Sequence, residues 1–125
     1  MEKMKIEINN GMKKMIEENA LGFATMDKEG NPHNIAIGYV EVVDKDKLLI
    51  INDEIKESIE NIKINPNIAI VVWNKEWKEN CIGYELKGRA EYYTEGKWYE
   101  RIKKTHPEFP SKGAILATIN KIKSL

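Results

Sequence analysis

Strand and turn signals alternate in residues 22–51, which read GFATMDKEGNPHNIAIGYVEVVDKDKLLII. Residues 22–25 predict a strand, and the sequence Asp-Lys-Glu-Gly at residues 27–30 predicts a hairpin turn. Residues 33–43 predict a second strand, which a further polar turn connects to a short and wholly apolar strand at residues 48–51. Strands joined by turns of this length pair antiparallel, so the stretch predicts an antiparallel sheet.

The rest of the chain adds short helices and further strands. Helices are predicted from Asn9 or Asn10 to Asn19, at residues 57–65 and at residues 97–104, and strands at residues 68–73, 82–92 and 114–122. The continuous apolar run at residues 68–73 predicts a strand covered on both faces, whereas alternation at residues 82–92 predicts one wet face. The second strand is expected to break or bend near Gly38, and Gly88 permits a close approach between strands. Six strands with three short helices favour a mainly β fold, an antiparallel barrel in one domain over residues 1–125.

Length and charge exclude several classes of protein. The chain has 125 residues, and its 20 basic residues balance 20 acidic ones, so no net charge favours nucleic acid or a membrane surface. The single cysteine, Cys81, cannot form an intramolecular disulfide, and a reducing compartment suits it. The first residues lack the apolar core of a secretory signal, and the apolar runs are too short to span a membrane. We therefore expect a cytoplasmic protein.

Several common catalytic motifs are missing from the sequence. It contains no Walker phosphate loop, no GxGxxG and no HExxH, and its two histidines, His33 and His106, are too few for a histidine-rich metal site. A lone cysteine such as Cys81 is more often structural than nucleophilic. We assign no catalytic residue and expect no metal.

The polar segment at residues 52–58 has features of an anion site. It joins an apolar strand to the start of a helix, where free backbone N–H groups, the Ser58 hydroxyl and the Lys56 ammonium suit a phosphate. The alternative is that Ser58 or a neighbour simply caps the helix. Glu54 and Glu57 oppose an anion because each adds negative charge nearby.

Residues 33–38 could form a wall for a flat ring. The small side chains and the glycine of this segment allow a ring to lie against the backbone, although a buried barrel strand explains them equally well. Trp73, Trp77 and Trp98 could stack on such a ring, but tryptophans in these positions are more often core or interface residues.

Six segments follow one another in a recognisable order. They are FATMDKEGNPHNIAI at residues 23–37, LLII at 48–51, SIENIKINP at 58–66, AIVVW at 69–73, LKGRAE at 86–91 and KGAILATI at 112–119. In this order they resemble the FMN-binding split-barrel superfamily, that of the pyridoxamine 5'-phosphate oxidase-related flavoproteins. The resemblance implies a six-stranded antiparallel split β-barrel of Greek-key type, assembled as a homodimer with FMN at the subunit interface.

The resemblance also implies which residues bind FMN. The isoalloxazine ring would lie against the second strand, the phosphate would sit before the second helix, and the partner's last loop and C-terminus would cover the flavin. The residues so implied are Asn34, Ile35, Ala36, Ile37, Gly38, Asn52, Asp53, Lys56, Ser58, Pro110 and Leu125, with Phe109 beside Pro110.

The chain departs from the family pattern in two ways. Glu57 occupies the position before the Ser or Thr of the phosphate turn, where the family usually has Lys or Arg, and Lys56 is expected to substitute for it. The sequence also ends without the segment that true pyridoxamine phosphate oxidases use for their substrate, so we do not expect vitamin B6 oxidation. The leading hypothesis is a flavoprotein that passes electrons or hydride between small-molecule or protein partners. The alternatives are a non-enzymatic flavin-binding or sensor module and a relative that binds a deazaflavin or haem.

Overall fold

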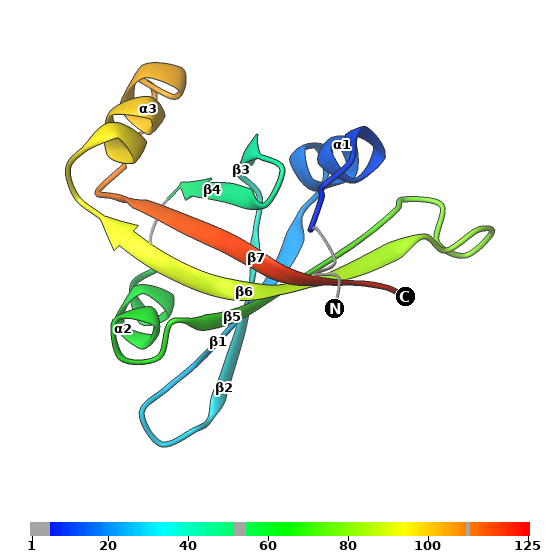
Figure 1. Ribbon diagram of the computed structural model, residues 1–125, viewed down its shortest axis with the longest axis horizontal. Coiled ribbons are helices and arrows are strands. Elements are labelled where there is room, and N and C mark those ends of the chain that lie inside the picture. Colours follow the sequence, from blue (N-terminus) through cyan, green and yellow to red (C-terminus); the bar gives the residue numbers. More distant parts are fainter. Residues whose placement is uncertain (1–5, 52–54, 110) are drawn as a thin grey trace, which may run out of the picture.

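Seven strands pair into one antiparallel sheet, and three short helices lie around it (Figure 1). The structure is a computed structural model, and it describes residues 6–51, 55–109 and 111–125. The elements are α1 (Asn10–Glu18), β1 (Leu21–Met26), β2 (Pro32–Ile37), β3 (Val40–Asp44), β4 (Lys47–Ile51), α2 (Lys56–Ile64), β5 (Asn67–Trp73), β6 (Gly83–Tyr93), α3 (Lys97–Thr105) and β7 (Ala114–Ser124). In the described part of the chain, no helix has the length and apolar character needed to cross a membrane.

The predicted mainly β, antiparallel fold is confirmed, but the predicted count of six strands is wrong. The sequence predicts one strand at residues 33–43, broken or bent near Gly38, and the structure has the break, with two strands, β2 and β3, separated by Gly38 and Tyr39. The strand order is β2-β1-β5-β6-β7-β4-β3, so β2 and β3 lie at opposite edges of the sheet. The pairings among the described residues include none between β2 and β3, so the barrel closure is not shown.

The predicted α1 helix is confirmed, and its cap is Asn9. The side-chain Oδ1 of Asn9 accepts a hydrogen bond from the backbone N–H of Met12 at 2.9 Å, as expected of an asparagine at this position. Ile16 is the fully buried residue of the helix, and it joins the main core.

The main core lies on one face of the sheet. It contains side chains from most of the strands, and its largest fully buried members include Phe23, Ile50, Ile70, Leu86 and Ile115. A smaller cluster forms where α3 covers part of the opposite face. That cluster contains Leu49, Ile51, Ile102, Ala114 and Leu116, with Trp98 packed against it.

The prediction that β5 is covered on both faces is wrong for the isolated chain. Ile68, Ile70 and Val72 are buried, but Ala69 and Val71 on the opposite face are only half-buried. Trp73, also on that face, is 47% exposed. We call this surface the outer face of β5. The apolar run therefore carries more hydrophobic surface than the single chain covers.

The predicted close approach at Gly88 is confirmed. The register of β6 against β7 shifts between Lys87 and Gly88, where Lys87 pairs with Lys121 and Gly88 with Ile119. A Cβ atom at Gly88 would lie 2.0 Å from the carbonyl oxygen of Thr118. Only glycine fits this position without movement of the backbone of β7.

We predict that Gly88→Ala lowers the free energy of unfolding by about 2–3 kcal/mol, because the new methyl group displaces the Thr118 carbonyl. The measurement is urea unfolding followed by circular dichroism. Gly38→Ala is the matched control, since a Cβ atom there meets nothing within 4 Å. Equal stability of the two variants would contradict the close contact at Gly88.

Candidate functional site

The described part of the chain buries three polar side chains, and all three lie where α2 packs against the sheet. Thr25 of β1 is 4% exposed, and Ser58 and Asn61 of α2 are 0% and 5% exposed. We call Thr25, Ser58 and Asn61 the polar corner. The amide Nδ2 of Asn61 donates a hydrogen bond to the Thr25 Oγ1 at 3.0 Å. Buried polar groups are costly unless they are hydrogen-bonded, so three of them in one place indicate a constraint other than packing.

The sequence of α2 explains how the corner is positioned. Ile59 and Ile62 are buried and anchor the helix on the core. Ser58 and Asn61 are three residues apart and therefore share a face of the helix, which also faces the sheet. Pro66 follows the helix and prevents its continuation, as predicted.

The Ser58 hydroxyl is the unusual member of the corner. Its Oγ is buried, and it has no hydrogen-bond partner in the described structure. The alternative that Ser58 caps α2 is wrong, because Ser58 is the third residue of the helix and the N-cap residue is Ile55. Ile55 has no side-chain acceptor for the N–H groups of the first turn. A buried hydroxyl without a partner costs about 1–3 kcal/mol, so this atom is suited to a partner from outside the described residues.

Glu57 is not a free carboxylate in the structure. Its Oε2 forms an ion pair with the Nδ1 of His33, which projects from β2. His33 pairs in register with Thr25 of β1, so the contact lies next to the polar corner. Sequence reasoning identified the unfavourable charge of Glu57 but not its partner.

The five implied ring-contacting residues at the end of β2 do not share one surface. Ile35 and Ile37 point to the core side, where Ile37 is buried and Ile35 half-buried. Asn34 and Ala36 alternate with them, are exposed, and lie beside Ala24 and Gly22 of β1. Gly38 follows the end of the strand. Successive side chains of a strand alternate between its two faces. A flat ring lying on one face can therefore contact the side chains of only one of the two sets.

The exposed set borders a shallow pocket. The pocket has a volume of about 310 Å³ and its lining is made largely of small side chains, among them Ala24, Asn34 and Ala69. Gly22 also lines it, and a Cβ atom at that position would lie 2.8 Å from the side chain of Val71. Of the segment 33–38 that the sequence offers as a wall for a ring, only Asn34 lines this pocket, and the other lining residues come mainly from β1 and β5.

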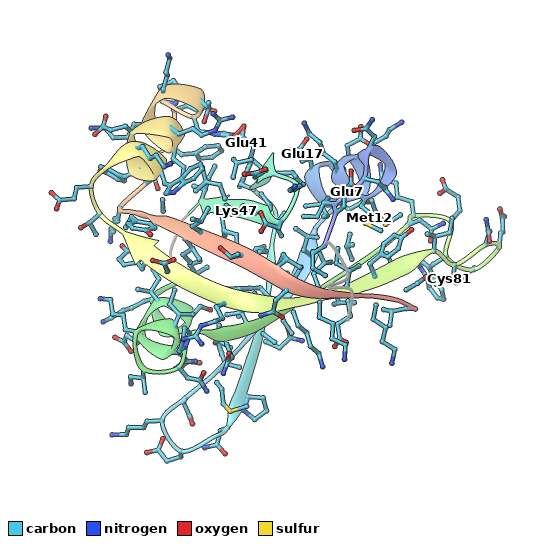
Figure 2. All side chains as sticks on the ribbon, in the orientation of Figure 1. Glu7, Met12, Glu17, Glu41, Lys47 and Cys81 are labelled. Carbon is cyan, nitrogen blue, oxygen red and sulfur yellow. The ribbon has the colours of Figure 1, made fainter. Side chains whose placement is uncertain are left out.

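A second pocket, of about 100 Å³, lies beside Gly38 and Tyr39. Glu17 and Glu41 also line it, and Figure 2 shows both carboxylates between α1, β3 and α3. Arg101 donates to Glu41 from Nε at 2.7 Å and from Nη2 at 3.1 Å, and this contact raises the pKa of Arg101.

Aromatic rings border the same pocket. The ring of Phe109 packs on Tyr39 with centroids 4.5 Å apart, and both rings approach His106. Phe109, implied by resemblance to contact a partner's flavin, thus contacts its own chain at Tyr39.

The chain does not bring Leu125 to the polar corner. The Leu125 N–H donates to the Gly83 carbonyl at 2.9 Å, at the start of β6. The connection that follows α2 contacts β6 at Ala90, whose N–H donates to the Pro66 carbonyl at 2.8 Å. Gly83 and Ala90 are roughly 23 Å apart along an extended strand. Leu125 is 61% exposed.

The remaining predicted residues are placed as follows. Lys56 is exposed at the first position of α2. Asn52, Asp53 and Pro110 lie outside the described residues. Cys81 is exposed and forms no disulfide, and Figure 2 shows it at the loop between β5 and β6.

Sequence reasoning missed Thr25, Asn61 and His33 as parts of the site. The available signal was the spacing of Ser58 and Asn61, which puts two polar groups on the buried face of a helix. The contributions of Thr25 and His33 depend on pairing between distant segments, which the local sequence does not show.

Comparison with known proteins identifies the family. The profile described as pyridoxamine 5'-phosphate oxidase matches residues 8–125. The chain belongs to the pyridoxamine 5'-phosphate oxidase family. The resemblance inferred from the ordered segments is therefore confirmed.

Members and structural neighbours of this family are similar to the chain along most of its length. The uncharacterized protein MJ0282 of Methanocaldococcus jannaschii is 30% identical over 96% of this chain and 82% of its own. The crystal structure of HupZ from Group A Streptococcus has a TM-score of 0.87 and 26% identity, over 94% of each chain. An FMN-binding protein from Syntrophomonas wolfei has the same fold, with a TM-score of 0.79 and 19% identity over 90% of this chain and 82% of that one.

We predict opposite effects on stability for the two α2 residues of the polar corner. In the protein without ligand, Ser58→Ala is expected to raise the free energy of unfolding by about 1 kcal/mol, because it removes an unpartnered buried hydroxyl. Asn61→Ala is expected to lower it by about 2 kcal/mol, because it leaves a cavity and removes the partner of Thr25. Urea unfolding of both variants measures the difference. A destabilising Ser58→Ala would show that the hydroxyl already has a partner.

Proposed function

We propose that this protein is an FMN-binding flavoprotein that serves as an oxidoreductase or electron carrier. The observation that supports the proposal most directly is the Ser58 hydroxyl, which is buried in the first turn of α2 and has no partner in the described structure. A phosphate at the N-terminus of α2 would accept its hydrogen bond and would also meet the positive end of the helix dipole. Family membership and the fold shared with an FMN-binding protein support the same cofactor.

The residues of the site fit FMN. Ser58 and the N–H groups of the first turn would hold the phosphate, and Lys56, at the first position of the helix, would add a positive charge. Glu57 would not compete for those N–H groups, because its carboxylate is paired with His33. The isoalloxazine would lie against the edge strand β2, where Asn34 lines the shallow pocket. Asn52 and Asp53, which we also assign to the site, lie outside the described residues.

When bound, FMN supplies the transfer of hydride or electrons. The chain's own residues bind the cofactor, orient it and exclude water from one of its faces. None of the described side chains is an evident proton donor to a substrate, and the chemistry proposed here requires none. A deazaflavin or haem in place of FMN, or flavin binding without turnover, is an alternative outcome of the experiments below.

We further propose that the protein works as a homodimer and that the second subunit covers the outer face of β5. Ala69, Val71 and Trp73 leave apolar surface open on that face, although the sequence of β5 is apolar throughout its middle. Association would bury this surface and bring Phe109, Pro110 and Leu125 of one subunit towards the flavin of the other. The free, exposed Cys81 fits a reducing compartment such as the cytoplasm.

We expect the purified protein to be yellow and to release FMN rather than FAD on heating. Ser58→Ala is expected to weaken FMN binding about tenfold or more, because it removes a hydrogen bond to a charged group. Flavin fluorescence titration measures the dissociation constant. Ser124→Ala, an exposed serine at the end of β7, is the matched control. A chain that binds neither FMN, a deazaflavin nor haem would overturn the proposal.

We expect Trp73→Lys to convert the dimer to monomers without unfolding the chain, because it puts a charge on the outer face of β5 while Trp73 is already 47% exposed. Sedimentation equilibrium measures the change. Trp77→Lys is the matched control, since Trp77 is 49% exposed and precedes β6 in the connecting loop. A monomeric parent protein would contradict the proposed assembly.

A further inference from the structure

The ion pair between Glu57 and His33 connects the proposed phosphate position to β2. Glu57 is the second residue of α2, and its Oε2 contacts the Nδ1 of His33. The side chain of His33 is 26% exposed and that of Glu57 is 66% exposed, so His33 is the more fixed partner. The two residues come from segments 24 positions apart, so the contact depends on the packing of α2 beside the β1–β2 hairpin.

A carboxylate in the first turn of a helix has two available positions. It can turn towards the free N–H groups at the helix start, which attract any anion, or it can turn away to another partner. In the first position Glu57 would occupy the same donors that a phosphate needs, and it would repel the phosphate. In the structure it takes the second position, and His33 is the partner that makes this possible.

We propose that His33 is a positioning residue that withdraws Glu57 from the phosphate position and makes FMN affinity depend on pH. This inference rests on the proposed function and deepens it. When His33 is protonated, its charge balances the carboxylate and holds it away from the helix start. When His33 is neutral, Glu57 contributes an unbalanced negative charge beside the phosphate. Histidine is the side chain whose charge ordinarily changes between pH 5 and 8, so the experiment compares a pH near the lower end of this range with one above it.

Most of the charged side chains around His33 and Glu57 are acidic. Glu60 of α2 and Asp27, Lys28 and Glu29 of the β1–β2 turn line the same pocket of about 390 Å³ as His33 and Glu57. Backbone hydrogen bonding by Asn31 lowers the pKa of Asp27, so that carboxylate stays ionised while histidine titrates. Lys28 contacts Glu29 at 4.0 Å.

These groups leave the region acidic apart from Lys28, His33 and the neighbouring Lys56. Protonation of His33 is therefore the step that supplies positive charge on the β2 side of α2.

The experiment measures FMN dissociation constants at pH 5.5 and pH 8.5 for the parent protein and for His33→Gln. Glutamine keeps a hydrogen-bond donor but cannot become charged. The phosphate of FMN titrates near pH 6 as well, but its titration is common to both proteins and cancels in the ratio of their dissociation constants. We expect His33→Gln to bind FMN about five- to tenfold more weakly than the parent at pH 5.5, and less than about twofold more weakly at pH 8.5.

Glu57→Gln tests whether His33 acts through Glu57. We expect this variant to bind FMN about fivefold more tightly than the parent at pH 8.5, because it removes the unbalanced charge. In the Glu57→Gln background, the effect of His33→Gln at pH 5.5 should fall below about twofold. Glu100→Gln, the same change at an exposed glutamate of α3, is the matched control, and it should leave the pH dependence of the His33→Gln ratio unchanged.

The outcomes separate the two proposals. A parent chain that does not bind FMN overturns both the proposed function and this inference. A parent that binds FMN, with a His33→Gln ratio that is the same at both pH values, overturns the inference alone. An undiminished effect of His33→Gln in the Glu57→Gln background also overturns it, because His33 would then act on the phosphate directly.

Discussion

The packing of α2 against β1 is the constraint on which the proposed site depends. The hydrogen bond from Asn61 to Thr25 holds the two elements together through atoms that are almost fully buried. A buried hydrogen bond adds little net free energy of folding when it forms, but a buried group left without its partner is strongly destabilising. Any other register of the helix on the strand would leave Asn61 and Thr25 unpaired, so the bond defines the register. In that register Ser58, in the first turn of α2, is buried against the sheet, and Glu57 contacts His33.

The same packing resolves a conflict in the sequence. A glutamate before the serine of a phosphate turn places negative charge where a phosphate is expected, and the linear sequence offers only Lys56 as compensation. The folded chain adds His33, which comes from the strand on the far side of β1. Glu57 therefore changes the charge balance of the candidate site, but it does not remove the site. A lysine or arginine at position 57 would not need His33 as a partner, whereas Glu57 does.

The sheet leaves apolar surface that the single chain does not cover. The outer face of β5 continues onto small residues of β1 and β2, including Gly22 and Ala24, which border a shallow pocket. Leu125 is exposed at the far end of β6 and β7. A second copy of the chain placed on this face would explain why a strand with the sequence of a fully buried one is open on one side.

The sequence by itself determined the order and type of the elements, because turn residues, helix caps and hydrophobic periodicity act over a few neighbouring positions. Asn9, Gly30, Pro66 and Gly96 end or begin elements where local signals predicted them. It placed a break or a bend near Gly38 but could not decide between them, because the pairing of β2 and β3 at opposite edges of the sheet is a tertiary feature. Tertiary structure alone decided that the Ser58 Oγ has no hydrogen-bond partner among the described residues. It also decided that Asn61 meets Thr25 and that Glu57 meets His33. Each of these contacts joins residues distant in sequence, and its existence depends on how α2 lies on the sheet.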